Sequence, residues 1–130
     1  MPYPTILPRS ARVLEEVSYE RQRQDAKWGE QNHPNGTGDD VALMHGVTLP
    51  KPHPRVAVTM GTLAHVARQV TDRAADDGSV TYADILLEEV GEAFAEADPA
   101  ALRAELIQVA AVAVAWVEKI DRDAGKERAS

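Results

Sequence analysis

Between Thr81 and Asp121 the sequence contains two stretches with apolar residues at helical spacing, separated only by Asp98-Pro99. This pairing restricts the fold more than any other feature. Thr81, with Asp84 three residues later, is typical of a helix N-terminus, with Asp in place of the usual Glu or Gln. Because Pro is well tolerated at the first helical position, Asp98-Pro99 ends one helix near Ala97 and begins the next. So short a connection predicts an antiparallel helical hairpin.

Two further helices are expected before this hairpin. Helical spacing of apolar residues predicts one over about 10–27 and another over about 55–75, the second ending at Asp77-Gly78. The fourth helix is expected to end near Asp121. The remaining parts are residues 1–9 as an N-terminal extension, 29–54 as an irregular loop and 122–130 as a frayed tail. Since no stretch alternates as a strand does, we expect one all-α domain, a four-helix bundle over residues 1–130.

The composition narrows the classes of function. The chain has 130 residues, no Cys and a net charge of -7. Without Cys, any metal must be held by oxygen or imidazole ligands, and a cysteine nucleophile is excluded. The negative charge disfavours binding to polymeric nucleic acid. The N-terminus lacks the pattern of a signal peptide, and no apolar run reads as long enough and free enough of charge to span a bilayer, so we expect a cytoplasmic protein.

Acidic residues concentrate on the third and fourth expected helices. Glu88, Glu89 and Glu92 lie close together on one helix, where like charges repel. On a solvated face each such pair costs only a few tenths of a kcal/mol, roughly, so a wet helix surface is one interpretation. A metal site is the other. The spacing alone does not decide between them.

Glu105 is harder to explain as a surface residue. It shares a face of the fourth helix with Leu102 and Val109, on the side that must pack inward. An unpaired carboxylate there costs several kcal/mol, roughly, or becomes protonated. A cation must therefore lie opposite it, either an arginine or a divalent ion that Glu89 and Glu92 also hold. The candidate arginines are Arg68, Arg73 and Arg103.

The acids read Glu88-Glu89-x-x-Glu92, twelve further residues, then Glu105-x-x-Gln108. From Thr81 to Asp121 this resembles the EExxE and ExxD motifs of the MazG-like all-α nucleoside triphosphate pyrophosphohydrolases. The segment ERQRQDAKWGEQ, residues 20–31, resembles the N-terminal signature of a phage- and actinobacterial-type branch of that family. One position departs from the pattern, because Gln108 stands where the family has Asp. Its amide oxygen can bind magnesium but supplies no charge, so we expect weaker metal binding or one ion instead of two.

The resemblance implies hydrolysis of an NTP or dNTP to the monophosphate and pyrophosphate, with Mg²⁺, or Mn²⁺ as a substitute. It implies metal ligands at Glu89, Glu92, Glu105 and Gln108, with Glu88 or Glu89 as the base that activates water. The residues expected to bind substrate are Arg23, Lys27, Trp28, Glu30 and Gln31. Two alternatives stay open at single positions: Trp28 as an apolar plug at the end of the bundle, and Gln108 as a hydrogen-bonding partner of a neighbouring helix. His65 faces away from the apolar stripe of its helix and is assigned no role.

The fourth helix also has apolar residues on its flanks, including Leu106, Ala110 and Val117. One antiparallel neighbour cannot cover them, and the apolar stripe of the first helix is thin. We therefore expect a homodimer or homotetramer that completes the bundle, with the site shared between subunits. The alternative to an enzyme is a MazG-like helical protein, catalytically impaired, that binds nucleotide or a partner protein without turnover.

Overall fold

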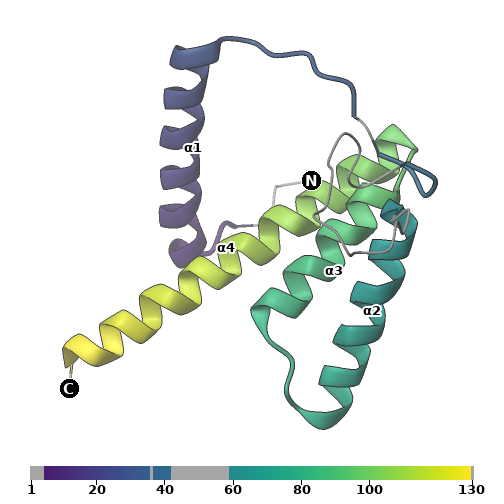
Figure 1. The fold of residues 1–130 in the computed structure, drawn as a ribbon. Helices are drawn as coiled ribbons and strands as arrows, with labels where there is room; N and C mark the ends of the chain where they lie inside the picture. Colours follow the sequence, from purple (N-terminus) through teal and green to yellow (C-terminus); the bar gives the residue numbers. More distant parts are fainter. Residues whose placement is uncertain (1–4, 36, 42–58, 130) are drawn as a thin grey trace, which may run out of the picture. The chain divides into compact units, whose positions relative to one another are not determined.

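A computed structural model describes residues 5–35, 37–41 and 59–129, and over these ranges the protein consists of four helices with no strand (Figure 1). The helices are α1 (Pro8–Trp28), α2 (Met60–Asp77), α3 (Tyr82–Ala95) and α4 (Pro99–Ala129). The all-α prediction is thus confirmed. The chain divides into two compact units, residues 35–110 and residues 1–34 with 111–130, which are described separately below. Most of the expected 29–54 loop lies outside the described residues.

Side-chain caps explain where α2 and α3 begin and end. The Thr59 hydroxyl accepts a hydrogen bond from the Thr62 N–H at 3.2 Å, so α2 starts at Met60. The start expected near residue 55 falls outside the described residues. Gly78 adopts a left-handed conformation with φ 76°, which ends α2 where the sequence predicted. Thr81 and Asp84 exchange hydrogen bonds of 3.1 and 3.2 Å and form the predicted capping box of α3.

The fourth helix begins as expected but continues further. The Asp98 carboxylate accepts a hydrogen bond from the Ala101 N–H at 3.0 Å, and α4 starts at Pro99. It extends to Ala129, so the end expected near Asp121 and the frayed tail after it are corrected. Good helix formers and the ion pair between Lys119 and Asp123, one turn apart at 2.5 Å, favour this continuation.

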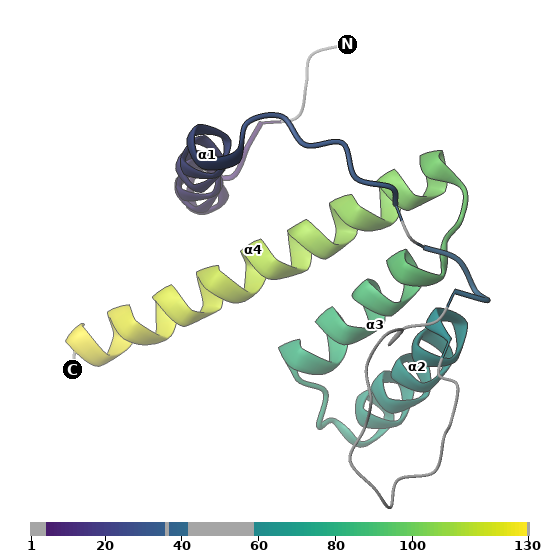
Figure 2. The same cartoon turned by 45° about the horizontal axis from the view of Figure 1, so that its top comes forward.

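In the unit of residues 35–110, α2 and α3 pack against each other, and α3 also lies beside the first half of α4 in both views (Figures 1 and 2). The buried positions between α2 and α3 are small: Ala64 and Ala67 on α2, Gly91 and Ala93 on α3. A Cβ atom at Gly91 would lie 3.0 Å from the Cα of Ala64. Only glycine permits so close an approach of two backbones without displacing one of them. Polar side chains at the rim of this contact are consequently brought close together.

A short segment of the long loop is fixed against the helix ends in the same unit. We call residues 37–41 the strap. The Gly38 N–H donates to the Phe94 carbonyl oxygen at 2.8 Å, near the end of α3. The Gly61 N–H, at the start of α2, donates to the Asp39 carbonyl oxygen at 3.1 Å. The strap thereby satisfies backbone groups that a helix leaves unpaired at its ends, and it holds Asp39 beside α2.

In the other unit, the N-terminal half of α1 contacts the second half of α4. The Ser10 hydroxyl donates to the Glu118 carboxylate at 2.6 Å, and Arg12 lies 3.8 Å from the Asp121 carboxylate. Val13 is buried, whereas Leu14 and Val17 are exposed. The thin apolar stripe predicted for the first helix is therefore reflected in the burial of its residues.

The segment Pro99–Gly125 of α4 corrects one expectation. By length and composition it is apolar enough to cross a membrane, although the sequence was expected to hold no such run. Its charges near the start, Arg103 and Glu105, are too few to exclude a span on composition alone. The feature is ambiguous by itself, because core helices of soluble proteins pass the same test.

Candidate metal site

Three glutamates from two helices converge in the unit of residues 35–110. Glu89 and Glu92 are three positions apart on α3 and so share a face, and Glu105 approaches them from the first half of α4. One carboxylate oxygen from each residue lies within 4.8 Å of the others. All three side chains are half-buried. These three glutamates can hold a metal ion, as the sequence predicted, and the helical hairpin is what brings them together.

The electrostatics of the cluster call for a cation. Within the part of the chain that the structure describes, one oxygen each of Glu89 and Glu105 is buried without a hydrogen-bond partner. Burial raises the pKa of Glu89, and the neighbouring glutamates raise it further. Burial is also the first cause of the raised pKa of Glu105, followed by the charge of Glu92, while Arg68 acts in the opposite direction. Without a positive partner these carboxyl groups favour protonation.

The sequence left two alternatives to a metal ion, a solvated helix face and an arginine paired with Glu105. Glu89 does not lie on a fully solvated helix face, because one of its carboxylate oxygens is buried and has no hydrogen-bond partner in the described ranges. Among the described residues, no ion pair joins Glu105 to Arg68, Arg73 or Arg103, although the charge of Arg68 acts to lower the Glu105 pKa. Arg68 is bonded to Glu92, with 3.2 Å between its Nη2 and the carboxylate Oε1, and Arg73 lines a different cavity. Arg68 thus reaches the cluster, at a different glutamate from the one expected.

The cluster borders a cavity of about 390 Å³ formed by α2, α3, the start of α4 and the strap. Its charged and titratable lining residues are Asp39, His65, Arg68, Glu92, Glu96 and Glu105. Sequence reasoning missed Asp39 and assigned no role to His65, which lines the cavity. Helical spacing holds a signal for the α2 wall, since Gly61, Ala64 or His65, and Arg68 recur every three or four residues. Asp39 has no such signal, because the strap places it through tertiary hydrogen bonds.

Two other predicted residues lie near the cluster but outside the group of three. Glu88 is half-buried and acts on Glu89 as a like charge that raises its pKa. Gln108 follows Glu105 by about one turn of α4 and is exposed. The roles of Glu88 as base and of Gln108 as ligand stay predictions.

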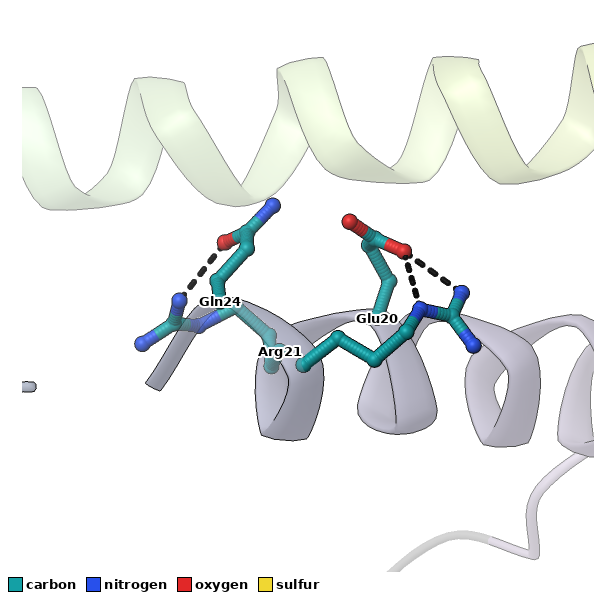
Figure 3. Close-up of polar contacts among 4 residues, drawn as sticks. Glu20, Arg21 and Gln24 are labelled. Carbon is teal, nitrogen blue, oxygen red and sulfur yellow. Dashed lines mark hydrogen bonds and ion pairs between the residues drawn. The ribbon is translucent and has the colours of Figure 1, made fainter. Parts of the chain in front are cut away.

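The five predicted substrate-binding residues belong to the other compact unit and are exposed: Arg23, Lys27, Trp28, Glu30 and Gln31. The Arg23 guanidinium donates to the Glu20 carboxylate at 2.9 and 2.5 Å, and Arg21 donates to Gln24 at 2.7 Å (Figure 3). The Lys27 ammonium lies 4.8 Å from the centre of the Trp28 ring, in a cation–π contact. The substrate-binding roles of these residues also stay predictions.

No protein-family model, curated protein or solved structure matches this chain. The function is therefore inferred from the residues and their geometry.

Proposed function

We propose that this protein is a MazG-like nucleoside triphosphate pyrophosphohydrolase, which hydrolyses an NTP or dNTP to the monophosphate and pyrophosphate with Mg²⁺. The observation that carries the proposal is the pair of buried oxygens on Glu89 and Glu105, which have no hydrogen-bond partner among the described residues and belong to a group of three converging carboxylates. Carboxylate oxygens are the ligands that Mg²⁺ and Mn²⁺ prefer, and a divalent cation removes the repulsion among the three acids. The adjoining cavity, which Glu92 and Glu105 line, is the space through which a phosphate chain would reach the site.

Each residue then has a defined task in the reaction. Glu89, Glu92 and Glu105 would hold the cation, which would supply positive charge for the phosphate oxygens and lower the pKa of water. Water attacks the α-phosphorus, its proton passes to a carboxylate, and the bond from the α-phosphorus to the bridging oxygen breaks to release pyrophosphate. Glu88 suits the task of proton acceptor because it lies outside the group of three, beside Glu89.

Gln108 favours a second candidate, a nucleotide-binding or partner-binding protein without turnover. It is neutral where the resembling family has Asp, so the site has one negative charge fewer for a second ion. The substitution Gln108→Asp separates the two readings. If the wild type hydrolyses nucleotide, we expect Gln108→Asp to preserve or raise the rate, whereas hydrolysis that appears only in Gln108→Asp would show a wild-type site impaired by Gln108.

The direct test measures pyrophosphate release from each NTP and dNTP with Mg²⁺ or Mn²⁺. Release with at least one nucleotide, abolished by a chelator, is expected. No release with any nucleotide, together with no metal-dependent rise in melting temperature, contradicts the enzyme. A nucleotide-dependent thermal shift without release identifies the binding protein instead.

We also propose that a second copy of this chain covers the apolar flanks of α4, giving a homodimer or homotetramer. Leu106, Ile107, Val117 and Ile120 on this helix are between 40 and 58 % exposed, which is unfavourable for such side chains in water. Sedimentation equilibrium at micromolar concentration should give the mass of a dimer or tetramer. A stable monomer contradicts this part of the proposal.

A further inference from the structure

Arg68 is the arginine of the cavity, and it is bonded to a residue of the acid cluster. Its Nη2 lies 3.2 Å from Oε1 of Glu92. Among the described residues that line the cavity, Asp39, Glu96 and Glu105 are further carboxylates, and Arg68 is the one permanently charged cation. The guanidinium therefore neutralises part of an otherwise acidic wall.

The same Glu92 belongs to the group of three that can hold a metal ion. A carboxylate can contact two cations, but a divalent ion at Glu92 repels a guanidinium a few ångströms away. The two cations therefore compete for this side chain. Arg68 is free to leave, because its side chain is 57 % exposed while that of Glu92 is 24 % exposed.

We propose that Arg68 is a tethered cation that occupies Glu92 while the metal is absent and transfers to the phosphate chain of the substrate when the metal binds. This inference rests on the proposed function. A guanidinium presents a planar pair of N–H donors that fits phosphate oxygens, and α2 holds Arg68 at the wall of the cavity that would admit them. In this role Arg68 binds the phosphate chain and favours substrates that carry a polyphosphate.

The exchange predicts opposite effects on two affinities. Removing the charge of Arg68 removes a competitor for Glu92, so Mn²⁺ should bind more tightly in the absence of phosphate. With Mn²⁺ saturating, pyrophosphate should bind more weakly, because a charged donor is lost. A purely structural ion pair predicts neither result, since half-exposed pairs contribute little and would not act on the two ligands in opposite directions.

The experiment compares the full chain with Arg68→Gln, Arg68→Lys and the control Arg73→Gln, which changes an exposed arginine of the same helix that lines a different cavity. Calorimetry measures Mn²⁺ alone, then inorganic pyrophosphate with Mn²⁺ saturating. Arg68→Gln should tighten Mn²⁺ by roughly three- to tenfold and weaken pyrophosphate by about tenfold. Arg68→Lys should retain part of the pyrophosphate affinity, and Arg73→Gln should match the wild type.

The exchange is contradicted if Arg68→Gln changes the affinities for Mn²⁺ and for pyrophosphate in the same direction. It is also contradicted if neither affinity changes. A wild-type protein that binds no Mn²⁺ contradicts it as well, since nothing would then displace Arg68. Because both readouts are binding measurements, they are independent of turnover. Opposite changes in a protein that releases no pyrophosphate from any nucleotide would support the role of Arg68 and contradict only the proposed catalysis.

Discussion

Glu20 on α1 and the glutamates that α3 and α4 bring together differ in the source of their positive partner. On α1, Glu20 is exposed, and Arg23 three residues later holds its pKa below the ordinary value, first by a hydrogen bond and then by charge. In the unit of residues 35–110, burial raises the pKa values of Glu89 and Glu105. The pKa of a glutamate side chain is thus lowered in one unit of the chain and raised in the other.

The difference lies in where the cation comes from. On α1 it is built into the sequence one turn away, and the pair forms within a single helix. Between α3 and α4, acids from separate helices converge, and the nearby arginine, Arg68, is bonded to Glu92. The buried oxygens of the other two glutamates have no hydrogen-bond partner among residues 5–35, 37–41 and 59–129. An ion from solution is the partner that fits this arrangement.

The largest expected effect is a loss of hydrolysis when a glutamate of the acid cluster is changed, with no loss when a glutamate of α1 is changed. Glu92→Gln should lower metal-dependent pyrophosphate release by roughly a hundredfold or more, because it removes a charged metal ligand. Glu16→Gln, an exposed position on α1, is the control and should keep wild-type activity. Rates are measured by pyrophosphate release at saturating nucleotide. Equal rates in the wild type and both variants would show that the acid cluster is not the active site.

The second effect is on stability. A metal that binds only the folded state at one hundred times its Kd stabilises the protein by about 2.7 kcal/mol. We expect Mg²⁺ or Mn²⁺ to raise the melting temperature of the wild type, and a chelator to reverse the rise. Glu105→Gln should remove most of the shift. A shift of the same size in this variant would place metal binding elsewhere in the chain.

Two helix-interior glycines give a third contrast between the units. Gly91→Ala gains helix propensity, but the new Cβ meets the Cα of Ala64 at 3.0 Å, so we expect a net destabilisation of about 1–2 kcal/mol. Gly125→Ala meets no atom within 4 Å and should stabilise by about 0.5–1 kcal/mol. Urea unfolding measures both. Stabilisation by both substitutions would show that α2 and α3 can separate at no cost.

How far the sequence predicts this structure depends on the range of the interactions involved. The boundaries at Gly78, Thr81 and Asp98-Pro99 follow from local capping chemistry, and they lie where the sequence indicated. The end of α4 near Asp121 was placed too early, because helix propensity carries the helix on to Ala129.

The site divides in the same way. Helical periodicity was enough to bring Glu89, Glu92 and Glu105 together once a hairpin was assumed. The sequence could not predict that Asp39 lines the cavity, because hydrogen bonds between distant segments hold the strap there. The sequence offered Arg68 as one of three arginines that could pair with Glu105, and Arg68 is bonded to Glu92 instead. A helical wheel predicts the face of the helix on which a long side chain lies. It does not predict which of two neighbouring carboxylates that side chain contacts.

The smallest expected effect is a difference in pH dependence. For Glu105 the folded-state pKa is raised above its ordinary value, so the folded protein holds more protons than the unfolded chain between these two pKa values. The contribution of Glu105 to stability is therefore present below the pKa that it has in the unfolded chain. This contribution is lost as the pH rises through the pKa that Glu105 has in the folded protein. For Glu20 the folded pKa is lowered, so its contribution is present above the unfolded pKa and is lost as pH falls through the folded value.

Urea unfolding with a chelator present, from pH 4 to pH 8, tests these signs in the wild type, Glu105→Gln and Glu20→Gln. Glu105→Gln should flatten the loss of stability toward high pH and make the metal-free protein more stable at pH 7, by about 1 kcal/mol or less. Glu20→Gln should flatten the loss toward low pH, by a smaller amount because the ion pair is exposed. With Mn²⁺ in place of the chelator, the high-pH loss should disappear in the wild type and in Glu20→Gln, whose acid cluster is intact, because the ion takes the place of the protons that the cluster must otherwise bind. Identical pH profiles for the wild type and Glu105→Gln would mean that the cluster is already neutralised within the protein, and the contrast with α1 would disappear.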